Sequence, residues 1–311
     1  MPGKADRPTR VIALMNQKGG VGKTTTSVNL AAAIAGTGRR TLLVDLDPQA
    51  HATLHLGVEP GELRERDRGS VYDLLLDPAY DPTQALIEVR DNLSLIPSET
   101  DLAAAESELG ALPQRHERLR SALRRLESTP AGGHEFVLLD CPPSLGLLTL
   151  NALVAAREVI IPMQAHFLAL QGVGKLLETV QLVRRQLNPS LSVAGIVLCM
   201  HDQQTTHTRE VVDDLEGFFS SSREQDVPWR FARVYRPAIR RNIKLAECPS
   251  FGQTIFDYAP WAPGGLDYKK LGEAIVREWD TMIDARDDAS PLSEAEITVL
   301  RGSLGATERT A

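Results

Sequence analysis

The fold is decided by the stretch Asn16-Gln17-Lys18-Gly19-Gly20-Val21-Gly22-Lys23-Thr24-Thr25. A short apolar run with a β-branched start, residues 11–15, precedes it, and an alanine-rich run, residues 26–35, follows it. These flanks predict a buried strand before the glycines and a helix after them. Glycine lets backbone amides turn inward, and the first turn of a helix adds unpaired N–H groups and a positive dipole end. The stretch therefore predicts a phosphate-binding loop built from backbone.

Two side chains of this loop have predicted roles in a nucleotide site. Lys23 is placed to reach β- and γ-phosphate oxygens, and the Thr24 hydroxyl to ligate Mg²⁺. The usual P-loop has a glycine five residues before Gly22, where this chain has Gln17 followed by a second lysine, Lys18. A chance glycine-rich turn is the competing explanation, and the predicted strand and helix on either side count against it.

Composition sets the broad class of the protein. The chain has 311 residues, of which 42% are hydrophobic, enough for the core of a large α/β domain. No apolar run approaches the roughly 20 residues of a membrane span, and residues 1–9 lack the apolar stretch of a secretory signal. The three cysteines are odd in number and widely spaced, which favours a reduced, cytoplasmic protein without a structural metal. The net charge of −7 means that a role on nucleic acid needs a local basic surface.

Two strands are predicted to end in carboxylates. Residues 41–47 finish in Asp45 and Asp47, which share one side of a strand because side chains alternate. Residues 136–140 form a second apolar run, which ends in Asp140. The carboxyl ends of parallel strands bind ligands, and a carboxylate at the end of a buried strand is the Walker B arrangement that serves Mg²⁺. A lone strand-end aspartate is equally often a cap or turn residue, and Cys141 is interpreted as small core filler.

Six apolar runs, beginning near residues 11, 41, 93, 135, 158 and 193, alternate with helical segments. This order predicts an α/β fold with a doubly wound, mostly parallel sheet and helices on both faces. Helices are predicted at residues 70–76, 114–127, 168–186 and 266–285. Residues 10–285 are expected to form one domain, after a disordered leader, residues 1–9, and before a flexible polar tail, residues 286–311.

Positive charge gathers in one part of this acidic chain. Residues 223–244 hold only two acidic side chains, Glu224 and Asp226, against seven basic ones: Arg223, Arg230, Arg233, Arg236, Arg240, Arg241 and Lys244. Such a run is usually a solvated face. The competing interpretation is a surface that contacts DNA phosphates, which needs arginine or lysine but no base-reading motif.

Four segments resemble, in the expected order, boxes of the ParA/MinD family of ATPases, and the resemblance spans residues 10–283. Residues 18–25 resemble the deviant Walker A box, with Lys18 directly before the glycine pair, and residues 41–49 resemble the Walker A′ box. Asp140 and the two prolines after Cys141 resemble the Walker B segment, and residues 239–252 resemble the box written with Pro-Arg-Asn and Glu-Ala-Pro. The resemblance implies a P-loop NTPase of the deviant Walker A type with ATP and Mg²⁺ as cofactors.

The resemblance also implies a role for each site residue. Catalysis is expected to use Asp47, which positions the attacking water, together with Lys23 and Lys18. In this family the early lysine reaches across the interface to the partner's nucleotide, so an ATP-sandwich homodimer is implied. Mg²⁺ is expected at Thr24, Asp45 and Asp140. The expected nucleotide-binding residues are Lys18, Gly19, Gly20, Val21, Gly22, Lys23, Thr24 and Thr25 of the loop, with Arg241 and Asn242 near the adenine.

The chain departs from the family pattern at positions that concern its partners. His166 and Gln171 stand where relatives carry acidic residues, and His166 is expected to be an ordinary surface or cap histidine. An arginine that helps relatives to bind DNA is missing from Asp202-Gln203-Gln204-Thr205, and Arg240 stands where proline is common. The candidate DNA contacts are Arg209, Arg236, Arg240, Arg241 and Lys244.

The function implied by the resemblance is that of an ATP-dependent, dimerising ATPase that binds double-stranded DNA nonspecifically and drives chromosome or plasmid segregation. Turnover is expected to be slow and to be stimulated by a ParB-like centromere-binding protein. The protein is expected to lie in the cytoplasm, associated with the nucleoid. The alternative is a MinD-like or other cargo-positioning ATPase on a membrane or protein scaffold, although residues 292–304 lack the basic face of a membrane anchor. A nitrogenase-type iron–sulfur reductase would need paired cluster cysteines, and Cys141, Cys199 and Cys248 do not match those positions.

Overall fold

The computed structural model describes residues 8–201 and 206–288, without the side chains of residues 167–171, 206–207 and 286–288. The chain divides into two compact units, Met1–Ala274 and Ile275–Ala311, and the boundary falls inside the last helix, α11 (Pro263–Asp288). The first unit contains the sheet and all the predicted site residues. The predicted domain limits at residues 10 and 285 stay predictions. Residues 1–7 of the predicted leader and 289–311 of the predicted tail lie outside the described residues.

The described residues form one eight-stranded sheet in the order β3-β4-β2-β5-β1-β6-β7-β8. Its strands are β1 (Arg10–Leu14), β2 (Thr41–Asp45), β3 (Ile87–Arg90), β4 (Leu93–Ile96), β5 (Phe136–Asp140), β6 (Glu158–Met163), β7 (Ser192–Leu198) and β8 (Arg233–Val234). All neighbours pair in parallel except β3, which runs antiparallel to β4 at one edge. The predicted α/β class with a doubly wound, mostly parallel sheet is confirmed.

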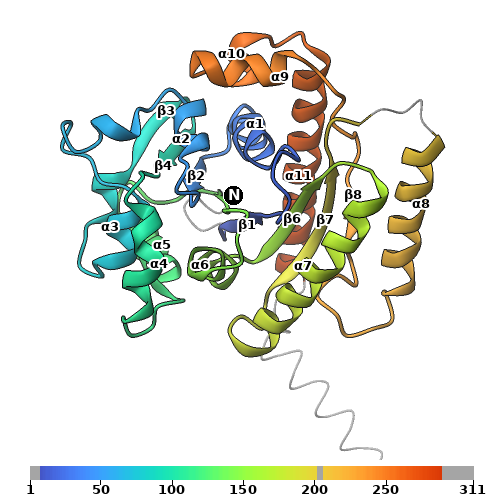
Figure 1. Cartoon of the computed structure of the whole chain (residues 1–311), viewed down its shortest axis with the longest axis horizontal. Helices are drawn as coiled ribbons and strands as arrows, with labels where there is room; N and C mark the ends of the chain where they lie inside the picture. The colour runs from blue at the N-terminus through green and yellow to red at the C-terminus, as the bar shows by residue number, and fades with distance from the viewer. Residues whose placement is uncertain (1–7, 202–205, 289–311) are drawn as a thin grey trace, which may run out of the picture. The chain divides into compact units, whose positions relative to one another are not determined.

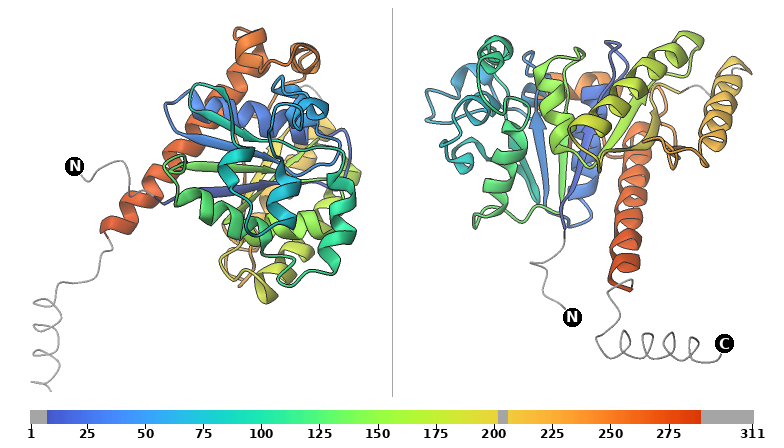
Figure 2. Two further views of the ribbon diagram at one scale, coloured as in Figure 1. Left: turned by 90° about the vertical axis from the view of Figure 1, so that its left-hand side faces the viewer. Right: turned by 90° about the horizontal axis from the view of Figure 1, so that it is seen from below.

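Helices cover both faces of the sheet, as Figure 1 shows. Helix α1 (Lys23–Ala35) lies on one face, and α5 (Arg118–Glu127), α6 (Leu147–Ala155) and α7 (Phe167–Gln186) lie on the other (Figures 1 and 2). The remaining helices are α2 (His51–His55), α3 (Val71–Leu76), α4 (Leu102–Gly110), α8 (Thr206–Ser221), α9 (Lys244–Glu247) and α10 (Ile255–Tyr258), with short 3-10 turns η2 (Pro60–Glu62), η3 (Pro82–Ala85) and η4 (Cys248–Phe251). None of the described helices is long and apolar enough to cross a membrane.

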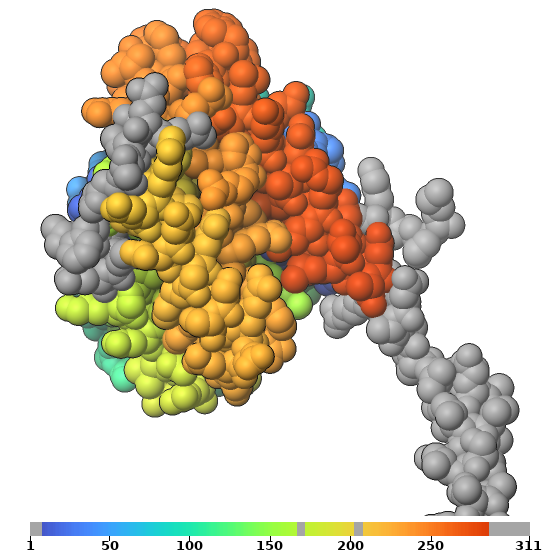
Figure 3. Space-filling view, turned by 90° about the vertical axis from the view of Figure 1, so that its right-hand side faces the viewer, coloured from blue at the N-terminus to red at the C-terminus, as the bar shows by residue number. Residues whose placement is uncertain are grey.

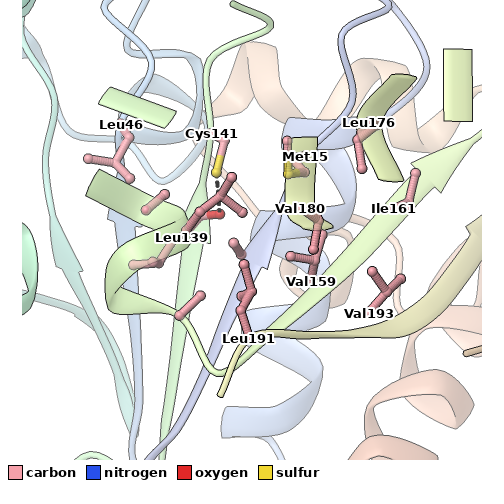
Figure 4. Packing of buried hydrophobic residues seen from close by; sticks show 14 of the residues in the cluster. Met15, Leu46, Leu139, Cys141, Val159, Ile161, Leu176, Val180, Leu191 and Val193 are labelled. Carbon is pink, nitrogen blue, oxygen red and sulfur yellow. Dashed lines mark hydrogen bonds between the residues drawn. The ribbon is translucent and has the colours of Figure 1, made fainter. Parts of the chain in front are cut away.

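The central strands are buried on both faces, which explains their nearly unbroken apolar sequences. Every residue of β2 and β5 is buried. Figure 4 shows part of the core on the α7 side of the sheet, where Val159 of β6 lies near Val180 of α7. Cys141 belongs to this core, as predicted: it is fully buried, and burial raises the pKa of its thiol to about 12.

Several element limits differ from the prediction. The predicted helix at 70–76 is confirmed as α3, with Ser70 as its N-cap. Helix α5 begins at Arg118 rather than at residue 114, because Gln114 has a φ of 53° in the left-handed region, which a helix excludes. Helix α11, predicted over residues 266–285, begins at Pro263 and ends at Asp288, since no glycine or proline interrupts the helix after residue 285. Strands β3 and β8 and helices α4 and α8 were not predicted.

Candidate active site

The loop between β1 and α1 bends through two left-handed glycines. Gly20 has a φ of 72°, and Gly22, the residue before α1, has a φ of 92°. Residues with a side chain rarely adopt this conformation. A Cβ on Gly22 would also lie 3.3 Å from the Cβ of Cys199. The amides of the first turn of α1 have no acceptor within their helix, so this bend presents donors to an anionic group.

Lys23 opens α1 and lies between two aspartates. Its Nζ donates to Oδ1 of Asp140 at 3.2 Å and lies 3.8 Å from Oδ2 of Asp47. Burial alone would lower the pKa of Lys23, but the negative charges beside it, chiefly Asp140, outweigh burial and raise the pKa overall. The lysine is therefore a fixed ammonium group at the carboxyl ends of β2 and β5.

Asp140 collects three side-chain donors from α1. Its Oδ1 accepts from Lys23 and from Ser27 Oγ at 2.7 Å, and its Oδ2 accepts from Thr24 Oγ1 at 2.9 Å. Carboxylate and hydroxyl oxygens are among the ligands that Mg²⁺ prefers in proteins. The structure thus brings together two of the predicted metal ligands, Thr24 and Asp140, in an arrangement that fits a magnesium ion.

Asp45, the third predicted metal ligand, is enclosed by protein groups. It is fully buried and pairs in register with Asp140 on the neighbouring strand. Its Oδ1 accepts from the backbone of Asp47 at 3.1 Å, and its Oδ2 accepts from the N and Oγ1 of Thr53 at 2.9 and 2.8 Å. Burial raises the pKa of Asp45 to about 7, and the charge of Asp140 adds to the effect. Both oxygens have protein partners, so a direct bond from Asp45 to a metal stays a prediction.

Asp47 follows β2 and is held in a defined direction. Its Oδ1 accepts from the backbone N–H of Gln49 at 3.1 Å, and its carbonyl accepts from Ser98 Oγ at 2.7 Å. The residue is 7% exposed, and its Oδ2 lies on the side of Lys23. A carboxylate fixed beside a lysine that is predicted to bind phosphate can orient a water molecule for attack.

A cavity of about 300 Å³ opens beside the loop. Arg241 and Asn242 line it, so the structure brings both predicted adenine contacts next to the phosphate loop. Sequence reasoning missed Cys199, Met200 and Tyr268, which also line the cavity. No motif marks these residues, because their approach depends on how the end of β7 and the start of α11 pack against α1.

Lys18 is exposed and contacts the connection between β6 and α7. Its backbone N–H donates to Oδ1 of Asn16 at 2.9 Å, and its Nζ lies 2.8 Å from Nε2 of His166. Among the ion pairs of the described residues, Asp140 pairs with Lys23 and not with Lys18. The early lysine is therefore kept apart from the charged cluster of its own chain.

Three of the predicted DNA contacts are already bound to carboxylates, and two of these three are arginines. Arg240 donates through Nε and Nη2 to the two oxygens of Asp267, both at 2.8 Å. Arg236 pairs with Glu216 at 2.9 Å. A phosphate would have to compete with these carboxylates, which reduces what either arginine adds to DNA binding.

Lys244, the third paired residue, and the two other predicted DNA contacts lie in different surroundings. Lys244 pairs with Glu247 at 2.7 Å, Arg241 lines the cavity beside the loop, and Arg209 is exposed on α8. The five predicted residues therefore do not form one uniform basic surface, and their contact with DNA stays a prediction.

Comparison with known proteins agrees with the geometry of this site. A family model described as an AAA domain matches residues 9–193. The chromosome partitioning protein ParA of Myxococcus xanthus is 41% identical over 86% of this chain and 88% of its own length. The chromosome-partitioning ATPase Soj of Thermus thermophilus is 45% identical over 86% of this chain and 95% of its own. A solved structure titled cobyrinic acid a,c-diamide synthase, from Mycobacterium smegmatis with bound ADP and magnesium, superposes with a TM-score of 0.70 at 37% identity, covering 88% of this chain and 96% of that one. The chain belongs to the ParA/Soj family of chromosome-partitioning ATPases, as the resemblance of its four boxes predicted.

Proposed function

We propose that this chain dimerises around ATP, binds double-stranded DNA nonspecifically in that state, and segregates chromosomes or plasmids with a ParB-like centromere-binding protein. The observation that carries the proposal is the position of Lys23 between Asp140 and Asp47, with Thr24 on the second oxygen of Asp140. The partition names of two relatives at 41% and 45% identity support the cellular role. The solved structure titled as a diamide synthase is less identical, at 37%.

ATP and Mg²⁺ are the cofactors of this site. The solved relative that contains ADP and magnesium supports this assignment. Lys23 and the loop amides would hold the phosphates, and the cavity lined by Arg241 and Asn242 would hold the base. Thr24 and Asp140 would hold Mg²⁺, which neutralises phosphate charge when bound.

Asp47, Lys23 and Lys18 have different roles in the proposed hydrolysis. Asp47 accepts a hydrogen bond from a water molecule and orients it toward the terminal phosphate, while Lys23 stabilises negative charge on the phosphate oxygens. Lys18 is exposed, so it is accessible to the phosphates of a second subunit. In other NTPases a cation supplied in trans is worth roughly 10³–10⁵ in rate, so dimerisation and turnover are coupled.

DNA binding would use arginines that have no carboxylate partner. Arg223 and Arg230 are exposed, and neither forms an ion pair within the described part of the chain. The guanidinium of Arg230 lies 4.3 Å above the ring of Phe231, which is 73% exposed. The segment that contains both arginines comes directly after α8 in the chain, and it lies on the face of the molecule seen in Figure 3. Phosphates can bind these arginines without displacing a carboxylate, which favours them as first contacts.

The test is binding to nonspecific duplex DNA with no nucleotide, with ADP, or with ATP and Mg²⁺. The wild type is expected to bind only with ATP, Lys23→Ala not to bind at all, and Asp47→Ala to stay bound because hydrolysis is blocked. If no DNA is bound under any nucleotide at low salt, the DNA part of the proposal is wrong. A cargo-positioning ATPase then becomes the better hypothesis, which co-sedimentation with liposomes would examine.

The proposed partner has a separate test. ATP turnover of the chain is measured alone, with DNA, and with DNA plus a ParB-like protein from the same genome. Turnover is expected to be slow in the first two cases and faster in the third. Fast turnover without any partner would count against regulation by a centromere-binding protein.

A further inference from the structure

From the contact at the phosphate loop we infer that His166 is a positioning residue, which holds Lys18 within its own subunit until the ATP-bound dimer forms. The inference rests on the proposed dimer. Lys18 Nζ and His166 Nε2 lie 2.8 Å apart. An ammonium group has only donors, so Nε2 must accept through its lone pair and the imidazole must be neutral, with its proton on Nδ1.

This contact is one of three that join the loop to the end of β6. Asn16 Nδ2 donates to the carbonyl of Pro162 at 2.7 Å, and Gln164 Nε2 donates to the carbonyl of Gly20 at 3.2 Å. On the loop, Asn16 and Gly20 lie on either side of Lys18, and on the other segment His166 follows both Pro162 and Gln164. The loop and the strand end are thus held together by groups that do not titrate, and the histidine adds a contact that depends on its protonation.

Lys18 cannot keep this contact and also reach a second subunit's phosphates, because its single ammonium group has to leave Nε2. The contact therefore competes with dimerisation. Lys18 is exposed, so water screens the contact and its net strength is that of an ordinary hydrogen bond. Loss of the contact between Lys18 and His166 is expected to favour dimer assembly about two- to fivefold per subunit. The two subunits together would then lower the dimer Kd by about four- to 25-fold.

The contact between Lys18 and His166 is sensitive to pH, because it needs the lone pair of a neutral imidazole. An imidazolium has no lone pair for Lys18 and repels it, so the contact forms when His166 is neutral and is lost on acidification. The other lysine of the loop, Lys23, is already paired with Asp140. Gln164 and Ala165 before the histidine carry no charge, and neither do residues 167–171 after it.

The experiment measures the dimer Kd by sedimentation velocity with a non-hydrolysable ATP analogue and Mg²⁺, at about pH 8 and about pH 6, across the range in which histidines titrate. His166→Leu removes the acceptor, and His166→Gln keeps an acceptor that does not titrate. At the higher pH the Leu variant is expected to dimerise about four- to 25-fold more tightly than wild type, and the Gln variant to match wild type. At the lower pH the Kd of the wild type should approach that of the Leu variant, while the ratio between the Gln and Leu variants stays as it is at the higher pH.

Controls separate this inference from the proposed function. His116→Leu, at a histidine in the segment before α5, should leave the wild-type pH dependence intact. Asp45, whose pKa burial raises to about 7, is common to all variants, so its effect on assembly cancels in the comparison. If the Leu variant does not fold, the different responses of wild type and the Gln variant to pH still decide.

Each contrary outcome has a distinct meaning. A wild type that does not dimerise with the analogue at either pH overturns the proposed function itself. A wild type that dimerises with the same Kd as His166→Leu at the higher pH overturns only the role of His166, as does a Gln variant that keeps the full wild-type pH dependence.

Discussion

At the scale of one residue, Gly22 occupies a position in the phosphate loop that does not tolerate a side chain. Its φ of 92° and the 3.3 Å that would separate an added Cβ from the Cβ of Cys199 both oppose a side chain. Gly22→Ala is expected to lower the free energy of unfolding by about 1–3 kcal/mol and to weaken ATP binding, since the loop must shift to relieve the strain. Urea unfolding and titration with a fluorescent ATP analogue measure the two effects.

Gly19 provides a matched control in the same loop. Its φ lies outside the left-handed region that marks Gly22, and no atom lies within 4 Å of an added Cβ. Gly19→Ala is expected to change the free energy of unfolding by less than about 0.5 kcal/mol. Equal destabilisation by the two variants would show that backbone conformation at Gly22 is not the cause.

The contacts of some site residues could be predicted from the sequence, and those of others could not. The approach of Lys23 and Thr24 to Asp140 was predictable, because a strand–loop–helix unit and a neighbouring strand end fix it. The surroundings of Asp45 were not, since they depend on Thr53, which α2 brings back to the end of β2. The contact between Lys18 and His166 was missed for the same reason, because it joins distant segments and no local pattern reports it.

At the scale of elements, the joint between α2 and η4 contains a buried histidine. His55 is 1% exposed, its Nε2 lies 3.5 Å from Sγ of Cys248, and burial lowers its pKa to about 4. An unfolded histidine takes up its proton near 6.5, so between these values the unfolded chain binds more protons. The free energy of unfolding should therefore fall as the pH drops from about 6.5 to about 4, by at most about 3 kcal/mol from this group.

Urea unfolding as a function of pH measures this effect. His55→Gln is expected to reduce the acid-side loss of stability, and His51→Gln, on the exposed side of the same helix, to leave it unchanged. Part of the loss should remain in His55→Gln, because burial also lowers the pKa of His134 to about 4. An unchanged pH profile in His55→Gln would mean that the histidine is not held neutral in the folded state.

The elements that were predicted and those that were missed differ in burial and length. Strands such as β5 lie inside the sheet, so both of their faces demand apolar residues and the run is visible. Strand β8 has two residues at the sheet edge, which is too short for any periodicity. Helix α8 did carry a usable pattern, since Val211, Leu215 and Phe219 are buried at a spacing of four residues.

Charge governs binding to DNA at the scale of the whole molecule. The chain carries a net charge of −7, so DNA repels it overall and attraction must come from local arginines. The double variant Arg223→Ala, Arg230→Ala is expected to weaken DNA binding and to lower the slope of log K against log salt by about 2 per subunit, one for each lost phosphate contact. The measurement uses the Asp47→Ala protein with ATP, so that hydrolysis does not disturb the equilibrium.

Arg236→Ala is the matched control, because this arginine is already paired with Glu216 at 2.9 Å. Its salt slope should stay close to that of the parent, and an equal loss of slope would mean that pairing with a carboxylate does not keep an arginine from DNA. The size of the change in the double variant carries further information. If the salt slope of the dimer falls by about 2, the arginines of one subunit contact the DNA. If it falls by about 4, the arginines of both subunits do. The larger value requires the ATP dimer to align two copies of this surface on one duplex, which links nucleotide binding to DNA affinity without any change inside the basic surface itself.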